Sequence, residues 1–219
     1  TQDMNFGGHL MAGWLIANAA TENAPERRAI TLMAIAPDLD GVFMFVSESG
    51  RELHRTFGHN VFFALVIPLI TIFFLSRNRR MKILPLLYIS MASHFILDLF
   101  VTGWWILTPF WPVSDWGILM TDWISEDVMK YYIQIGLFII FIIPTVYIII
   151  KKKRTPFEIL GTAADRFLQT FVTLPFRSHC AYCNARAFYL CEKCGAALCG
   201  RHRRFSGIFK PICRDSHQK

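Results

Sequence analysis

Long apolar blocks separated by short polar runs dominate the pattern of this 219-residue chain. The longest block, residues 131–150, matches the hydrocarbon core of a bilayer, which is about 30 Å thick, at about 1.5 Å per helical residue. Residues 83–101 are also long enough, although they contain a histidine and an aspartate. Residues 61–75 are apolar but short, so a span there needs a thinner bilayer or a helix that continues into polar residues. The pattern predicts a membrane protein built from helices.

Two further segments resemble membrane helices more weakly. Residues 6–21 are rich in small residues, which suits close packing of helices in a membrane. Residues 29–46 begin as a helix and are interrupted by the sequence PDLDG, as in a broken helix that lines a site. We therefore predict an all-α integral membrane protein with about five membrane helices, some short or broken, in a domain over residues 1–154.

The composition agrees with this class. Hydrophobic residues make up 53% of the chain and charged residues 18%, whereas soluble domains carry about 25% charged residues. Residues 102–129 contain five tryptophans, a residue type enriched where a membrane meets water, so we expect a loop or surface helix at headgroup level. The N-terminus lacks the basic segment that begins a secretory signal peptide.

Basic residues set the expected orientation, because they concentrate in cytoplasmic loops. The runs SRNRRMK (76–82) and KKKR (151–154) would both be cytoplasmic, and so would residues 22–28. Most of the unusual polar residues of the apolar segments then lie near the opposite face. We expect a multi-pass protein of the cell (inner, cytoplasmic) membrane with a polar site toward the extracytoplasmic side.

Ionisable residues within the apolar segments stand out because charge is costly to bury in a membrane. Each alone has an ordinary explanation, such as a histidine satisfied in the core or a turn at PDLDG. Together they supply four imidazoles and three carboxylates, the N and O ligands that zinc, manganese or iron take. Seven ligands exceed one tetrahedral site, and a two-metal centre suits hydrolysis of a phosphate ester. The residues are His9, Asp38, Asp40, His54, Arg55, His59, His94 and Asp98.

The sequences GGH, PDLDG, HRTFGHN and SHFILDLFVTGWWILTPFWP occur in a characteristic order over roughly residues 4–115. This order resembles the LexA-regulated, membrane-bound, metal-dependent hydrolases of the YdjM-like family, which are distantly similar to zinc-dependent phospholipase C and P1-type nucleases of helical fold. One position departs from the family: Gly41 stands where a second histidine is common. Its ligand could come from Glu48, Glu52 or Asp115, or from water. The resemblance implies the metal ligands His9, Asp38, Asp40, His54, His59, His94 and Asp98.

The expected function is a membrane-bound, metal-dependent hydrolase acting on a phosphoester, either a phospholipid or a lipid-linked phosphate. Asp38 or Asp40 would orient or deprotonate the attacking water, and Arg55 would hold a phosphate oxygen. The ions would be one or two divalent metals, zinc or manganese. A non-catalytic membrane scaffold that retains a structural metal and recruits a partner is the alternative. A transporter is the third, although the chain has no internal repeats.

Residues 155–176 place apolar side chains at helical spacing, which predicts an amphipathic linker helix. Such a helix would lie on the cytoplasmic membrane surface or pack against the segment that follows.

All six cysteines lie after residue 179, with the spacing C-x2-C-x7-C-x2-C-x4-C-x2-H-x10-C-x3-H. Eight ligands fill two tetrahedral zinc sites, so residues 177–219 are expected to form a small cytoplasmic zinc-binding domain in a reducing compartment. The order resembles a cross-brace finger of the AN1 or B-box type. That resemblance implies one zinc on Cys180, Cys183, Cys199 and His202, and a second on Cys191, Cys194, Cys213 and His217.

Two questions about this segment stay open. A one-zinc ribbon that uses only the four cysteines of the CxxC pairs is the fallback, and His179 is not expected to be a ligand. The segment is basic, so its simplest partner is the anionic headgroups of membrane lipids. A protein partner or a nucleic acid is the alternative.

Overall fold

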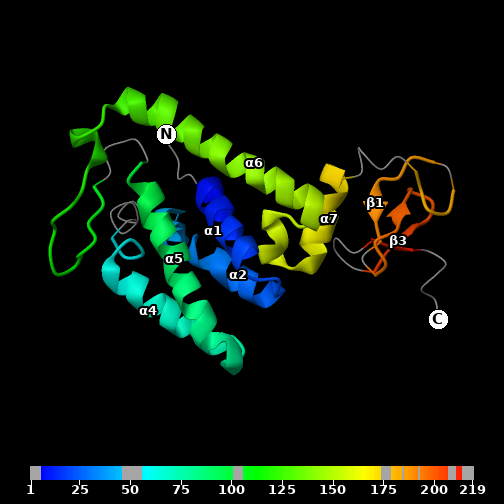
Figure 1. Cartoon of the computed structure of the whole chain (residues 1–219), viewed down its shortest axis with the longest axis horizontal. Coiled ribbons are helices and arrows are strands. Elements are labelled where there is room, and N and C mark those ends of the chain that lie inside the picture. Colours follow the sequence, from blue (N-terminus) through cyan, green and yellow to red (C-terminus); the bar gives the residue numbers. More distant parts are fainter. Residues whose placement is uncertain are drawn as a thin grey trace. The chain divides into compact units, whose positions relative to one another are not determined.

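The structure, a computed structural model, describes residues 6–45, 56–100, 106–173, 179–183, 185–191, 193–206 and 211–213. It divides into two compact units, Thr1–Ile143 and Pro144–Lys219. The described part is mostly helical, with short strands confined to the Cys-rich end (Figure 1).

Four helices form the packed part of the first unit: α1 (Phe6–Ala20), α2 (Ala24–Met33), α4 (Val61–Thr71) and α5 (Arg80–Asp98). Helix α5 lies against the other three, and α1 also packs on α2. Their shared core contains fully buried apolar side chains such as those of Ala17, Ile30, Met33, Leu87 and Met91.

Close approach of α1 to its neighbours depends on Gly13. A Cβ at this position would lie 2.4 Å from the Cβ of Ala34 and 3.2 Å from the hydroxyl oxygen of Ser90. The small residues of α1 therefore let its backbone approach α2 and α5, as the sequence predicts for this helix.

The helix expected over residues 29–46 is broken, as PDLDG predicts, but it begins earlier. Asn23 caps α2, and its side chain accepts a hydrogen bond from the backbone N–H of Glu26. The helix ends at Met33, and a 3-10 helix, η1 (Pro37–Phe45), follows. This tighter segment carries Asp38 and Asp40.

Within the described residues, two helices are long and apolar enough to cross a membrane, Arg77–Asp98 and Val128–Lys152. The first comprises η3 (Arg77–Arg79) and α5; the second comprises a π-helical turn, η5 (Val128–Ile133), and α6 (Gln134–Lys152). Helix α4 with η2 (Ile72–Phe74) is apolar but shorter. By helix length, then, two of the expected spans are supported; α1 and α2 are 15 and 10 residues long.

The described Trp-rich residues before α6 are largely irregular. Leu107 and Ile118 form an isolated antiparallel bridge, and a short 3-10 turn, η4 (Met120–Asp122), follows. The exposed side chains of Trp116 and Trp123 agree with the predicted loop at an interface.

The linker expected as one amphipathic helix is two pieces. A 3-10 turn, η6 (Pro156–Leu160), ends at Gly161, whose φ of 117° lies in a region that favours glycine, and α7 (Thr162–Thr173) follows. Asp165 joins the pieces, because its Oδ1 accepts hydrogen bonds from the backbone N–H and the hydroxyl of Thr155, at 2.6 and 2.8 Å.

The Cys-rich end holds two small antiparallel hairpins. Strand β1 (Tyr189–Leu190) pairs with β2 (Ala197–Leu198), and β3 (Arg203–Phe205) pairs with β4 (Pro211–Cys213). The larger of its apolar clusters has only Cys191, Leu198 and Cys213 as buried members. A core of this size does not stabilise a fold alone.

Candidate metal centres

Five polar side chains from four separate segments meet inside the first unit. Helix α1 contributes His9, η1 contributes Asp38, the segment before α4 contributes His59, and α5 contributes His94 and Asp98. All five side chains are at most 6% exposed. We call these residues the His/Asp centre.

Three ligand atoms of this centre form a nearly equilateral triangle. The Nε2 atoms of His59 and His94 are 3.1 Å apart, and Asp98 Oδ2 lies 3.2 Å from the first and 3.3 Å from the second. Nitrogen and oxygen ligands bind zinc at about 2.0–2.2 Å, which places neighbouring ligand atoms about 3–3.6 Å apart. The triangle therefore has the size of one face of a metal coordination sphere.

Asp38 and His9 extend the triangle, and with His94 they form a second possible ligand group. Asp38 Oδ1 lies 3.5 Å from His59 Nε2 and 3.8 Å from His94 Nε2, at the distance of a fourth ligand. His9 Nε2 lies 3.1 Å from the other oxygen of Asp98, Oδ1. The Asp98 carboxylate thus faces two histidines with one oxygen and a third histidine with the other, as a carboxylate shared by two ions does.

Hydrogen bonds outside the centre orient its histidines. His94 Nδ1 lies 2.8 Å from the carbonyl oxygen of Ala34, so it carries the proton and leaves Nε2 as the free electron pair of the ring. Asp40 Oδ2 accepts the backbone N–H of Gly58 at 2.9 Å and lies 3.7 Å from His59 Nδ1. Asp40 therefore supports His59 from behind in this geometry.

Gly58, directly before His59, occupies a position where a side chain would not fit. A Cβ at Gly58 would lie 2.3 Å from the carbonyl oxygen of Pro37 and 2.9 Å from Asp40 Oδ2. This contact fixes the segment that carries His59 against the 3-10 helix that carries the aspartates.

The charges of the centre are unbalanced. Burial lowers the pKa of His59, but hydrogen bonds to Asp38, Asp40 and Asp98 raise it to about 10. In the described part of the chain, the buried atoms His9 Nδ1 and Asp38 Oδ2 form no hydrogen bond. A protonated His59 offsets only one of the carboxylates Asp38, Asp40 and Asp98 around it, and a divalent cation that displaced this proton would balance the excess negative charge.

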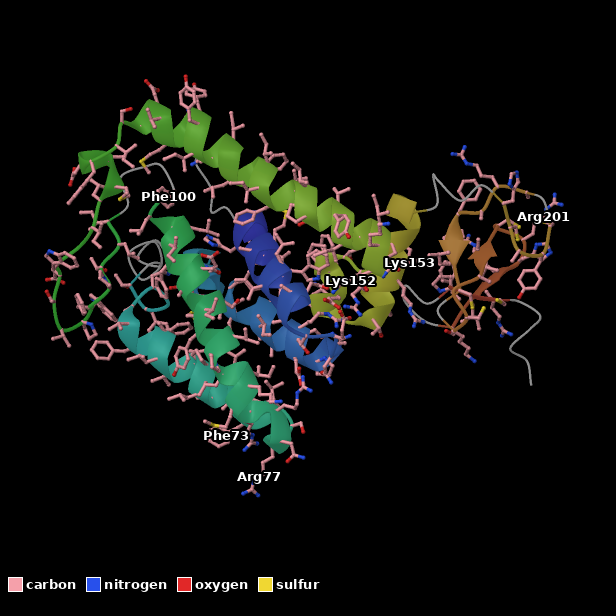
Figure 2. All side chains as sticks on the ribbon, in the orientation of Figure 1. Phe73, Arg77, Phe100, Lys152, Lys153 and Arg201 are labelled. Atoms are coloured by element: carbon pink, nitrogen blue, oxygen red, sulfur yellow. The ribbon has the colours of Figure 1, made fainter. Side chains whose placement is uncertain are left out.

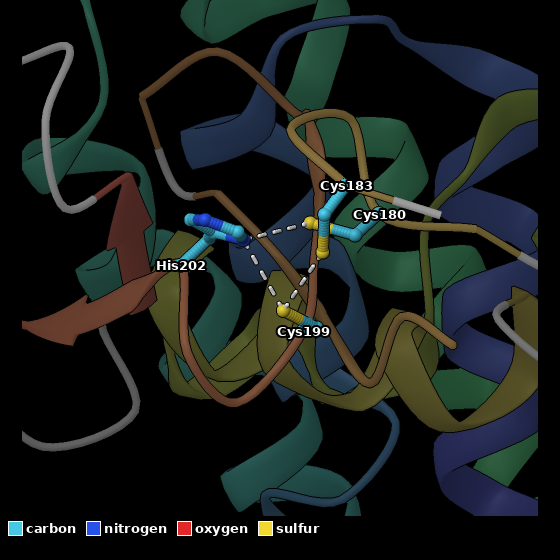
Figure 3. Close-up of side chains that lie close together, drawn as sticks. All are labelled: Cys180, Cys183, Cys199 and His202. Carbon is cyan, nitrogen blue, oxygen red and sulfur yellow. Dashed lines mark hydrogen bonds between the residues drawn. The ribbon is translucent and has the colours of Figure 1, made fainter. Parts of the chain in front are cut away.

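Four ligand atoms of the Cys-rich end form a second cluster (Figure 3). Cys183 Sγ and Cys199 Sγ are 3.7 Å apart, and His202 Nδ1 lies 3.6 Å from Cys180 Sγ and 3.4 Å from Cys199 Sγ. Tetrahedral zinc with Zn–S bonds of about 2.3 Å places its ligand atoms about 3.5–3.8 Å apart. Disulfides need about 2.05 Å, so these sulfur atoms are spaced for an ion.

Cys191, Cys194 and Cys213 form the third cluster, with Cys194 Sγ and Cys213 Sγ 3.5 Å apart. The two cysteine clusters alternate along the chain, which is the cross-brace order. The fallback that joins the two CxxC pairs around one ion is not the grouping in the structure. His217, the fourth ligand expected here, lies outside the described residues.

In each cluster at least one thiol has its pKa lowered toward the thiolate that binds metal, while the pKa of Cys183 and of Cys194 is raised. Burial raises the pKa of Cys180, but backbone hydrogen bonds at Tyr182, Cys199 and Cys183 bring it to about 6. Burial likewise raises the pKa of Cys191, and hydrogen bonds at Cys194 and Cys213 lower it to about 6. Thiolates, the ligands of zinc, therefore predominate at these two positions near pH 7.

The remaining expected residues divide into two groups. Asp115 and His179 are exposed and belong to none of the ligand clusters. Sequence reasoning missed the carbonyl of Ala34 and the tight contact of Gly58. A contact to a backbone carbonyl gives no signal in a sequence, whereas a glycine directly before a ligand histidine could have indicated the tight contact of Gly58. Residues that lie outside the described part of the chain are Glu48, Glu52, His54 and Arg55.

Comparison with known families gives one match: the family described as YdjM inner membrane protein, over residues 4–174. The matched range contains the His/Asp centre and ends before the first cysteine. No curated protein and no solved structure matches the chain.

Proposed function

The chain belongs to the YdjM inner membrane protein family, and from this premise we propose that it is a membrane-bound, metal-dependent hydrolase of phosphoesters. The observation that supports the proposal is the triangle of His59, His94 and Asp98, with Asp38 at the distance of a fourth ligand. A catalytic zinc site has three protein ligands and an open position.

In this proposal, His59, His94 and Asp98 would hold zinc or manganese, with Asp38 beside the open position, and His9 would serve a second ion. A divalent ion supplies Lewis-acid chemistry, lowering the pKa of a water molecule and withdrawing charge from a phosphoryl oxygen. The chain supplies the rest: Ala34 and Asp40 fix the two histidine rings, and Asp38 can accept the proton of the attacking water. Arg55 remains the residue proposed to bind the phosphate.

The proposed substrate rests on the expected depth of the centre in the membrane. His94 and Asp98 lie in the last turns of α5, about 21–27 Å along the helix from Arg80. Figure 2 shows Arg77 and Phe100 at opposite ends of this helical segment. With the basic end cytoplasmic, the centre lies near the extracytoplasmic headgroups. A phospholipid or a lipid-linked phosphate places its phosphoester at this depth.

The proposal is tested with the full chain reconstituted in nanodiscs. We expect metal-dependent hydrolysis of a phosphoester that stops on chelation and in Asp98→Asn, which keeps the shape of the side chain. Asp115→Asn, an exposed carboxylate outside the clusters, is the matched control and should retain metal and activity. Bound ions with no turnover of any phosphoester would instead favour the scaffold that recruits a partner.

We further propose that residues 177–219 bind two zinc ions and dock on anionic lipid headgroups of the same membrane. This segment contains nine basic and two acidic residues, so it carries the whole net charge of +7. Arg203 lies 4.1 Å from the ring centre of Tyr189 and 4.8 Å from that of Phe205, which is 45% exposed. An arginine packed over two adjacent aromatic rings at a surface suits the headgroup region.

Hydrogen exchange of the full chain in nanodiscs tests this docking. Residues 201–206 should gain protection when phosphatidylglycerol replaces phosphatidylcholine, and high salt should reverse the gain. Arg203→Glu should abolish it, whereas Arg166→Glu, an exposed arginine of α7, should not. Equal protection in both lipids would point to a protein or a nucleic acid as the partner.

A further inference from the structure

A pocket lies beside the His/Asp centre, between α1, α5 and the first two turns of α6. Its polar lining consists of His9 and Gln134. The rest is apolar and includes Met11 of α1, Leu97 of α5, and Leu137 and Phe141 of α6. Among the described residues no charged side chain lines it, so the pocket is polar at His9 and Gln134 and apolar elsewhere.

His9 connects the pocket to the chemistry. Its Nε2 lies 3.1 Å from Asp98 Oδ1, while the same side chain forms part of the pocket wall. A molecule in the pocket therefore reaches the edge of the His/Asp centre without crossing another layer of side chains.

The wall formed by α6 is a helical stripe. Gln134, Leu137, Phe138 and Phe141 recur with the spacing i, i+3, i+4 and i+7, which covers about 10 Å along one face of the helix. Phe138 is 56% exposed, so the stripe borders the surface of the unit. Only 11% of the apolar window of this helix is buried, which leaves its remaining surface to the bilayer.

We infer that this pocket, which we call the acyl groove, holds an acyl chain of the phospholipid whose phosphoester lies at the His/Asp centre. This inference rests on the proposed function for the position of the phosphate. An amphiphile matches the order of the lining, with its polar group at His9 and Gln134 and its chain along Leu137 and Phe141. Because Phe138 lines the pocket and is largely exposed, we place the entry of the lipid beside it, sideways from the hydrocarbon, so the substrate does not leave the membrane.

Photolabelling tests the groove independently of catalysis. The full chain in detergent micelles is titrated with phosphatidylglycerol that carries a diazirine on one acyl chain, and labelled peptides are mapped by mass spectrometry. Labelling is read on the α1 and α5 walls, at Met11 and Leu97, because substitutions on α6 leave these peptides unchanged. We expect labelling there to saturate and to be displaced by unlabelled phosphatidylglycerol.

Two substitutions on α6 form a matched pair. Leu137→Trp fills the groove and should reduce labelling of the α1 and α5 walls roughly tenfold. Ile140→Trp adds the same ring at a position that is 62% exposed and outside the lining, and should leave labelling within about twofold. Leu137→Phe fills less of the groove and should reduce labelling by a smaller factor. Unchanged metal content of the His/Asp centre shows that each variant is folded.

The outcomes separate the groove from the hydrolase. Saturable labelling with no metal-dependent turnover supports the groove and removes the proposed function. Labelling of the α1 and α5 walls that does not saturate, or that is equal in Leu137→Trp and Ile140→Trp, overturns the groove, whatever the turnover.

Discussion

The His/Asp centre and the Cys-rich end are two candidate metal sites built on opposite principles. Ligands of the first come from residues as far apart as His9 and Asp98, and a packed helical core positions them. Ligands of the second fall within 34 residues, between Cys180 and Cys213, around a core of three buried side chains. In the first region, packing of the helices positions the ligands. In the second region, we expect metal binding to stabilise the fold.

This difference follows from the energies available to each region. A small module without a large apolar core obtains its folding free energy from metal binding, which contributes about 10–16 kcal/mol for structural zinc. The helical unit buries apolar side chains and fixes His94 through the Ala34 carbonyl with or without an ion. The two regions should therefore respond differently to the loss of metal.

The largest expected effect is that of chelation. Treating the full chain with a strong chelator should unfold residues 179–213, because the free energy that zinc supplies is lost. The helices α1, α2, α4 and α5 should keep their hydrogen-exchange protection. Simultaneous loss of protection in α1 and α5 would show that the helical unit also depends on its ion.

Next in size is the effect of Asp40→Asn, which weakens an interaction behind a ligand. Asp40 accepts the Gly58 N–H and faces His59 Nδ1, and losses of such supporting groups reduce metal affinity by about 10–100-fold. Metal binding at the Cys-rich end should be unaffected. Metal titration with element analysis of the full chain measures both numbers, and an unchanged affinity of the His/Asp centre would remove the supporting role.

Gly13→Ala tests the claim that the fold holds the centre. Its Cβ would meet Ala34, whose carbonyl orients His94, so crowding should cost about 1–3 kcal/mol in the free energy of unfolding of the helical unit. Gly7→Ala is the control on the same helix, since its Cβ would meet no atom within 4 Å. Thermal unfolding of the two variants compares the effects, and equal stability would contradict tight packing at Gly13.

The sequence was informative where spacing reflects geometry. The pair His94 and Asp98 lies one helical turn apart, and the CxxC pairs mark their own clusters, so both could be read from residue order. The position of Asp40 behind His59 depends on the 3-10 turns of η1, which no periodicity reveals. The break at Gly161 was missed because the apolar spacing continues across it, while only the backbone angle shows the interruption. Contacts to backbone atoms, such as Ala34, were likewise invisible.

Asp165→Asn should have the smallest effect on stability. It tests where the metal-dependent Cys-rich end gives way to a part stabilised by side-chain contacts. Helix α7 shares a compact unit with the Cys-rich end but is tied to Thr155 by side-chain hydrogen bonds, without metal ligands. Burial raises the pKa of Asp165, so its carboxyl stabilises the fold most when protonated, at low pH, and this contribution is lost as the pH rises through the folded pKa. Asparagine keeps the oxygen that accepts from Thr155 and has no charge to bury, while its NH2 group replaces the acceptor of Gln169 Nε2–H, which the Gln169 amide restores by turning over. At pH 7 the variant should be as stable as the parent or slightly more so, by less than about 1 kcal/mol, and the difference should shrink toward pH 4.

Hydrogen exchange of the Thr155 amide measures this difference, with zinc content unchanged. A loss of zinc in Asp165→Asn would show that the metal-dependent region extends into α7.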